Sequence, residues 1–310
     1  MSTYEQLGSL SGDLARLVSD SLNAVVMIAR REGAPRTGLV LDDHRIVSVA
    51  RSAEIGEKVS VDFPDGQEGE GEVVAFDATS GVGILTLPAE GPARSITSPP
   101  HREAPLRVGE LTVTLALPSP DGVEARLGMV RCAGGATHLP GGRRIAQYLQ
   151  TDATQYPGFL GAPVLDAEGR LAGITMASRN DGFIVPTGEL LRILDALSDN
   201  PDIGMGYLGV RTESAPLPDS VATGLEGQSH GMLIIGVDSD SPAESAGLRV
   251  GDSIVSVDRR PIADLQTLAD ALIGTNGGEI SIAVARGGDV LTLQARPTVQ
   301  RMRRRHRRRR

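Results

Sequence analysis

The chain has 310 residues, of which 40% are hydrophobic and 3% aromatic, and its formal net charge is −8. This length suffices for two globular domains. A single cysteine, Cys132, excludes an internal disulfide, and we interpret it as a buried structural thiol. The 38 glycines and 19 prolines, with so few aromatic residues, favour short strands joined by tight turns, so we expect a mainly β fold.

The two ends of the chain differ in charge. The N-terminal segment MSTYEQLGSLSGDLARLVSD carries acidic residues early and lacks the apolar core and cleavage site of a secretion signal. The apolar run at 24–29 is too short to span a bilayer, so we expect a cytoplasmic protein. At the other end, RMRRRHRRRR holds eight arginines, and removing their charges from −8 leaves −16 on the rest of the chain. We expect this tail to be disordered.

The hydrophobic pattern changes along the chain from helical to β and then to a mixed texture. Leucines recur at helical spacing near the N-terminus, and two similar sets of β-type runs follow, separated by Gly, Pro and Asp. The second set ends in an amphipathic helix at 187–199, which Asn200-Pro201 stops. The predicted segments are an N-terminal helix and extension at 1–20, a first β-barrel at 21–100, a second with its helix at 101–199, a linker at 200–205, a small domain at 206–297 and the tail at 298–310.

Two stretches of the sequence carry a family resemblance. TDATQYPGFLGAPVLDAEGRLAGI followed by GFIVP resembles the nucleophile region of HtrA-type (Deg) trypsin-like serine proteases, and SPAESAGLRVGDSIVSVDRRPIADLQTLADAL resembles their PDZ domain. The match covers residues 20–297. It implies a mainly β fold, in which a trypsin-like double β-barrel with a His-Asp-Ser triad at its junction is followed by an α+β PDZ domain.

The resemblance places three residues of this chain at the triad positions. Leu160, in GFLGAP, stands at the nucleophile position, Arg51 at that of the base and Gly81 at that of the acid. An isobutyl group has no proton to lose, a guanidinium offers no acceptor, and glycine has no carboxylate. On these grounds we predict that the chain is a pseudoprotease and not an enzyme. The alternative is an HtrA-type serine endopeptidase with a relocated or unconventional catalytic site.

The turn GFLGAP has two interpretations of its own. Its backbone N–H groups at Gly158, Phe159 and Leu160 form a candidate residual oxyanion loop. We favour an architectural role, in which the glycines permit positive φ and Leu160 packs into the vacated cleft. In the alternative, the cleft binds a peptide without cutting it, and Phe159 and Leu160 supply apolar contacts.

The stretch GYLGV matches the carboxylate-binding loop of PDZ domains. Such a domain adds an extended C-terminal peptide to its sheet as a strand and receives the terminal carboxylate on backbone N–H groups. The helix expected from DLQTLADAL puts two leucines on one face, either as walls of the groove or as plain core. The candidate peptide-binding residues are Tyr207, Leu208, Gly209, Val210, Arg211, Thr212, Leu268 and Leu272.

The sequence therefore predicts a scaffold, adaptor or regulator that binds peptides or protein C-termini through its PDZ domain. The resemblance also implies homo- or hetero-oligomers with HtrA-type proteins, because that family assembles into trimers through its barrels. We expect no cofactor and no metal site. The arginine tail has two interpretations, which are contact with nucleic acid or an anionic membrane surface and an uninformative extension.

Overall fold

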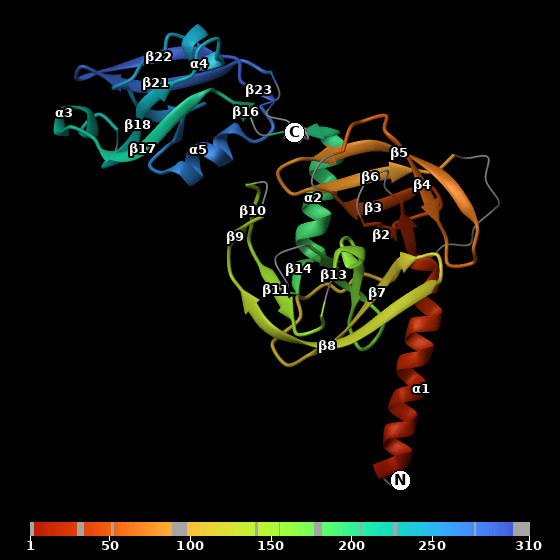
Figure 1. Ribbon diagram of the computed structural model, residues 1–310. Coiled ribbons are helices and arrows are strands. Elements are labelled where there is room, and N and C mark those ends of the chain that lie inside the picture. Colours follow the sequence, from red (N-terminus) through yellow and green to blue (C-terminus); the bar gives the residue numbers. More distant parts are fainter. Residues whose placement is uncertain are drawn as a thin grey trace, which may run out of the picture. The chain divides into compact units, whose positions relative to one another are not determined.

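The computed structural model describes residues 3–29, 34–50, 53–88, 98–139, 142–154, 156–176, 182–204, 206–225, 228–275 and 277–299 (Figure 1). The chain divides into two compact units, the first comprising Met1–Leu139 and Arg144–Pro201 and the second comprising Pro140–Arg143 and Asp202–Arg310. Within the described residues, no helix is both long enough and apolar enough to cross a membrane. Arg51 and the arginines of the tail lie outside the described residues.

The first unit begins with the predicted amphipathic helix. Helix α1 spans Thr3–Ser21 and has no buried residue, so its leucine stripe remains at least partly exposed. A short 3-10 turn, Leu22–Ala24, then leads the chain into the first barrel. This confirms the helix expected from the leucine spacing.

The first barrel is an antiparallel sheet closed on itself. Its strands pair in the order β5-β4-β1-β2-β3-β6, and β5 also pairs with β6 to complete the circle (Figure 1, orange and brown). Inward-facing apolar side chains fill it, among them Val26, Ile46, Val61 and Phe63. The strands are β1 (Val25–Ile28), β2 (Arg36–Val40), β3 (Arg45–Val49), β4 (Lys58–Asp62), β5 (Glu68–Asp77) and β6 (Val82–Thr86).

The second barrel closes in the order β11-β14-β13-β12-β7-β8. Helix α2 (Thr187–Asp199), which has the predicted bounds, follows β14 and buries Leu190, Ile193 and Leu197. The barrel strands are β7 (Leu111–Ser119), β8 (Gly122–Gly134), β11 (Tyr148–Thr151), β12 (Pro163–Leu165), β13 (Leu171–Thr175) and β14 (Phe183–Pro186). Strands β9 (Thr137–His138) and β10 (Arg144–Ile145) pair with each other, and a 3-10 turn, η2, spans Pro157–Phe159.

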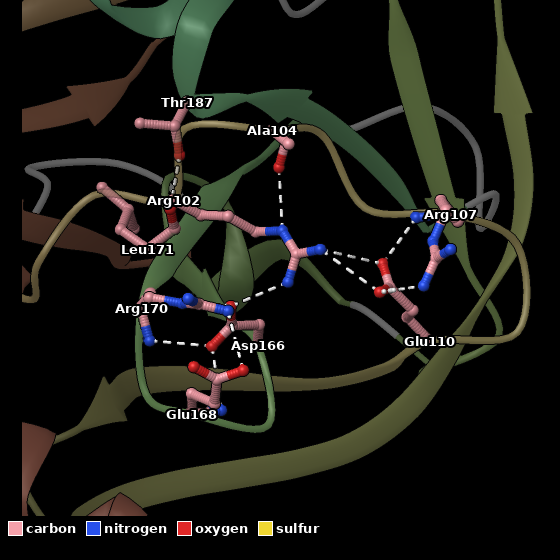
Figure 2. A network of polar contacts seen from close by, with 9 residues as sticks. All are labelled: Arg102, Ala104, Arg107, Glu110, Asp166, Glu168, Arg170, Leu171 and Thr187. Atoms are coloured by element: carbon pink, nitrogen blue, oxygen red, sulfur yellow. Dashed lines mark hydrogen bonds and ion pairs between the residues drawn. The ribbon is translucent and has the colours of Figure 1, made fainter.

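A network of charged groups fastens the segment before β7 to the β12–β13 hairpin (Figure 2). Asp166, whose side chain is 3% exposed, accepts hydrogen bonds from Nη1 of Arg102 at 3.0 Å and Nε of Arg170 at 2.8 Å. Arg102 also reaches both carboxylate oxygens of Glu110 at 3.2 Å. Burial alone would raise the pKa of Asp166, but the backbone N–H and guanidinium of Arg170, with Arg102, outweigh burial and hold that pKa below its usual value. The segment is therefore fixed to the second barrel.

The second unit contains a separate antiparallel sheet in the order β17-β18-β19-β21-β22, with β20 paired to β19. Its core includes Leu208, Met232, Ile254 and Ile282. The strands are β17 (Val210–Pro216), β18 (His230–Val237), β19 (Ser253–Val257), β20 (Arg260–Pro261), β21 (Ile280–Arg286) and β22 (Asp289–Ala295). The helices are α3 (Asp219–Ala222), α4 (Pro242–Ser245) and α5 (Leu265–Leu272).

Two predicted boundaries differ from the structure. Strand β23 (Thr298–Val299) pairs with β16 (Gly206–Tyr207), so residues 298–299 belong to the domain and not to the tail. Strand β15 (Asp202–Ile203) lies inside the predicted linker. Both strands have two residues, too few for an alternating pattern to show in the sequence. The predicted fold class, a double β-barrel followed by an α+β domain, is confirmed.

Candidate functional site

The turn at 157–163 lies where the two barrels of the first unit meet. Gly161 has φ +86°, and a Cβ there would lie 2.5 Å from the carbonyl oxygen of Thr37 and 3.0 Å from the backbone nitrogen of Val49. Backbone this close to β2 and β3 leaves no room for a side chain. The glycine therefore serves both a left-handed conformation and a close approach between barrels.

Buried hydroxyl groups from both barrels hold this turn. Thr37 Oγ1 donates to the carbonyl of Gly158 at 2.8 Å, and the N–H of Thr37 donates to the carbonyl of Leu160 at 3.2 Å. From the other side, the hydroxyl of Thr175 donates to the carbonyl of Phe159 and accepts from the N–H of Ala162. Because both threonine side chains are buried, these bonds fix the turn's backbone between β2 and β13.

The N–H groups of the predicted oxyanion loop are largely engaged within the turn. The N–H of Phe159 donates to the carbonyl of Tyr156 at 2.8 Å, and the N–H of Leu160 donates to the carbonyl of Pro157 at 3.2 Å. An oxyanion hole needs donors aimed at the developing charge. An anion that accepts from the N–H groups of Phe159 and Leu160 would have to displace those two bonds.

Phe159 and Leu160 differ in burial. Phe159 is 1% exposed and packs with Ala116 and Ala162 in a small core cluster, so it supports the barrel and offers nothing to a bound peptide. Leu160 is half-buried and lies in the turn beside the first barrel. The structure thus supports an architectural role for Phe159 and leaves part of the Leu160 side chain accessible.

The segments that carry the other two predicted triad positions approach this turn. The N–H of Ala50 donates to the carbonyl of Gly81 at 2.7 Å, which puts Gly81 beside the residue that precedes Arg51 in the chain. Val49 in turn lies against Gly161. The structure therefore brings residues 49–50, 81 and 160–161 into one region, as the resemblance implies.

The candidate carboxylate loop of the second unit is anchored on one side by residues 238–243. The carbonyl of Leu208 accepts from the N–H of Ala243, and that of Gly209 accepts from the N–H of Asp238, both at 2.8 Å. No described peptide bond is cis, so each N–H points opposite to the carbonyl of its own peptide unit. The N–H groups of Gly209 and Val210 therefore point away from residues 238–243, side by side, as in an anion-binding nest.

Gly209 is required by this loop. Its φ is +81°, and a Cβ there would lie 2.3 Å from the Cβ of Ser241. Any side chain would push the loop off residues 238–243 and misdirect its N–H groups. Gly209 therefore serves both a left-handed conformation and a close approach to Ser241.

Strand β17, which follows the loop, is an edge strand. It pairs with β18 on one side, no described strand pairs with its other side, and helix α5 contacts it. Val210 and Thr212 are half-buried, whereas Arg211 is exposed. An open edge beside a helix is the geometry that accepts a peptide as an added strand.

The two leucines predicted to line the groove are part of the core. Leu268 is 4% exposed and Leu272 is 7% exposed, and both belong to the same cluster as Leu208. This burial favours plain core, the second of the two interpretations, for both leucines, and their contact with a bound peptide stays a prediction. As core residues they pack α5 against the sheet.

One residue of this site was missed by sequence reasoning. Asp238 lies after β18 and accepts from the hydroxyl of Tyr207 at 2.6 Å and from Nη1 of Arg211 at 3.0 Å. The hydrogen bond to Asp238 raises the pKa of Tyr207. The sequence holds no signal for these contacts, because Asp238 is 31 residues from Tyr207. Among the described residues, no group of three or more His, Cys, Asp or Glu is placed to hold a metal ion.

Comparison with known families matches both parts of the chain. Residues 29–174 match the trypsin-like peptidase domain, and residues 206–296 match the PDZ domain. Among solved structures, a serine endoprotease from Yersinia pestis is 22% identical, with a TM-score of 0.68, and covers 93% of this chain and 98% of its own. The HtrA-type protease AlgW, solved with a tripeptide, is 24% identical, with a TM-score of 0.64 and coverage of 93% and 97%. These structures confirm the fold.

The relatives in sequence are named as serine proteases. The putative serine protease HhoA of Synechocystis is 28% identical over 249 residues, which make up 76% of this chain and 63% of HhoA. The serine endoprotease DegS of Escherichia coli is 28% identical over 271 residues, 83% of this chain and 75% of DegS. A probable periplasmic DegP-like endoprotease of Chlamydia trachomatis is 25% identical, and the aligned part covers 54% of it.

These relatives correct one prediction. Leu160, Arg51 and Gly81 led us to predict that the chain is not an enzyme, but the relatives that align with most of it are named serine proteases or endoproteases. The prediction is therefore contradicted. One statement behind it remains: the side chain at position 160 cannot act as a nucleophile, since leucine holds no nucleophilic atom.

Proposed function

We propose that this chain, whose two parts match the trypsin-like peptidase domain and the PDZ domain, is an HtrA-type protein and that its PDZ domain binds the free C-termini of extended peptides. The ligand would add to the open edge of β17, with backbone hydrogen bonds along its length. Its terminal carboxylate would accept from the N–H groups of Gly209 and Val210.

The observation that carries this proposal is the direction of those two N–H groups. The carbonyls of Leu208 and Gly209 are both bound to residues 238–243, so the N–H groups at the start of β17 are turned away from that segment. Hydrogen bonds from N–H groups to a carboxylate are stronger than those to a neutral oxygen. The free carboxylate should therefore contribute much of the affinity. A structure of the HtrA-type protease AlgW with a tripeptide offers a parallel in a protein of the same fold.

Titration calorimetry on the full chain tests this proposal. A peptide with a free carboxylate and an apolar last residue should bind with a Kd in the micromolar range, about −8 kcal/mol at 1 μM. The same peptide amidated at its C-terminus should bind at least about tenfold more weakly, because the charged acceptor is lost. Equal binding of the two peptides would contradict the proposal.

A pair of glycine variants localises the binding. Gly209→Ala should abolish measurable binding, because the added Cβ would collide with Ser241. Gly287→Ala is the matched control, since Gly287 also has a positive φ, +60°, but has open space where its Cβ would lie. Unchanged binding by Gly209→Ala, with both variants folded, would mean that the peptide binds elsewhere.

The names of the relatives favour a second candidate function, peptide-bond hydrolysis. Because residue 160 is leucine, we propose that a serine at another position serves as the nucleophile. A fluorophosphonate should then label one serine covalently, and mass analysis of the labelled peptide would identify it. Its replacement by alanine should abolish both the labelling and the hydrolysis of casein. Absence of both reactions in the unmodified chain would contradict this candidate.

We also propose two kinds of partner beyond the peptide. The barrel domain is proposed to associate with HtrA-type proteins, either copies of this chain or homologues, as the resemblance implies. The arginine-rich segment at 301–310 is proposed to bind an anionic surface, because its eight positive charges adjoin no acidic residue in the sequence. Analytical ultracentrifugation tests the first partner, and salt-dependent binding tests the second.

A further inference from the structure

We infer that Asp238 is the positioning residue of the carboxylate loop and determines how strongly the domain prefers a free C-terminus. This inference rests on the proposed function of the PDZ domain. Asp238 itself touches no ligand in this scheme. It acts by fixing the loop residues whose N–H groups would bind the carboxylate.

Asp238 contacts three residues of the loop. Its N–H donates to the carbonyl of Gly209, and its carboxylate accepts from the Tyr207 hydroxyl at 2.6 Å and from Arg211 at 3.0 Å. Those residues stand before, within and after the N–H pair of Gly209 and Val210. A single side chain thus bridges the two ends of the loop, and its own backbone holds the middle.

The loop needs such an anchor because its centre is a glycine with positive φ. Glycine has the greatest backbone freedom in the unfolded or unanchored chain, and ordering it costs more free energy than ordering any other residue. The backbone at the Tyr207 end is held by the pairing of β16 with β23 and by the bond between the Leu208 carbonyl and the Ala243 N–H. The carboxylate of Asp238 adds the side-chain restraint that joins this end to Arg211, and so limits movement of the N–H groups between them.

The two side-chain contacts of Asp238 should contribute unequally to holding the loop. The pair with Arg211 is exposed, with 66% of the arginine side chain and 42% of the aspartate side chain accessible, and such pairs contribute little. Arg211 lies across Gly236 of β18, where a Cβ would be 2.4 Å from its Nη2. The bond to the Tyr207 hydroxyl is partly buried and shorter, so it should carry most of the positioning.

Three variants of the full chain separate these contributions. Asp238→Ala removes both side-chain contacts, Tyr207→Phe removes the hydroxyl bond alone, and Asp238→Asn removes the charge but keeps an acceptor for the hydroxyl. Asp289→Ala is the control, since Asp289 is an exposed carboxylate of the same domain at the start of β22. The readout is the ratio of the Kd of an amidated peptide to that of the same peptide with a free carboxylate.

Asp238→Ala and Tyr207→Phe should each lower this ratio by at least about fivefold, while the affinity for the amidated peptide changes less than about twofold. Asp238→Asn and the control should keep the ratio within about threefold of the unmodified chain. The double variant Tyr207→Phe/Asp238→Ala should lose no more than either single one, because both remove the same anchor. Thermal unfolding verifies that each variant is folded. If Asp238→Ala does not fold, the ratio measured for Tyr207→Phe decides the test alone.

Different failures have different meanings. If the unmodified chain binds both peptides equally, the proposed function fails and the inference fails with it. If the unmodified chain prefers the free carboxylate and Tyr207→Phe and Asp238→Ala keep that preference, the proposed function stands and the inference is overturned. An equal loss of affinity for both peptides would also overturn it, because it would show a general effect on the groove.

Discussion

At the scale of the residue, two glycines determine the backbone conformation of the two turns that this account depends on. Gly161 lets the second barrel approach the first, and Gly209 lets the carboxylate loop rest on Ser241. The need for glycine at both positions could be predicted from the sequence, because the motifs GFLGAP and GYLGV fix their place. The contacts of Asp238 could not, since they join residues distant in the chain through the fold alone.

Gly161→Ala should lower the free energy of unfolding by about 2–4 kcal/mol, because positive φ and a collision with the Thr37 carbonyl act together. Gly56→Ala should cost only about 1 kcal/mol, since Gly56 shares the positive φ, +84°, but has open space around it. Urea unfolding at neutral pH measures both. Equal losses would mean that the turn relaxes away from β2 without cost.

At the scale of the element, the sequence pattern predicts a helix or strand correctly where residues close together in the chain determine it. The helix at 187–199 has the predicted bounds because an amphipathic period is followed by Asn200-Pro201. The attachment of residues 100–102 to Leu171 was not predictable. It depends on backbone hydrogen bonds and on Asp166, which are brought together only by the closed second barrel (Figure 2).

Asp166 should make the free energy of unfolding of the first unit depend on pH. The pKa of its carboxyl is depressed in the folded state, so its contribution is present at neutral pH and is lost as the pH falls below about 4. Asp166→Asn should destabilise by about 3 kcal/mol at pH 7, because a neutral amide with one acceptor oxygen cannot replace both carboxylate oxygens, of which Oδ2 binds Arg102 and Arg170 and Oδ1 binds backbone N–H groups.

The measurement is urea unfolding of both proteins at pH 7 and pH 3. The difference between Asp166→Asn and the unmodified chain should shrink as the pH falls. Asp65→Asn is the control, because Asp65 is exposed and its bond to the Gln67 N–H survives the change. A difference that stays constant down to pH 3 would show that ionisation of Asp166 plays no part.

At the scale of the whole molecule, the order of domains could be predicted because each carries its own motif. The double barrel and the PDZ domain were both expected and both are confirmed. The prediction that the chain is not an enzyme rested on three positions, of which Arg51 lies outside the described residues, and the relatives contradict it. The proposed peptide binding rests instead on the carboxylate loop and the edge strand β17 of the second unit.

The arginine tail should act by electrostatics and independently of both domains. Replacing residues 301–310 by an uncharged tail of equal length should leave thermal stability and peptide affinity unchanged, because the core clusters of both units are built from residues that precede the tail. Binding to DNA or to anionic vesicles should fall, and in the unmodified chain it should weaken steeply with added salt. Binding that persists at high salt would contradict this account.

The most direct test of peptide binding at the loop is amide hydrogen exchange on the full chain with and without a peptide ligand. A peptide with a free carboxylate should slow exchange at the N–H groups of Gly209 and Val210 and along the open edge of β17. The amidated peptide should protect the edge less and leave Gly209 and Val210 nearly unchanged. Protection confined to other parts of the chain, or equal protection by both peptides, would contradict the account.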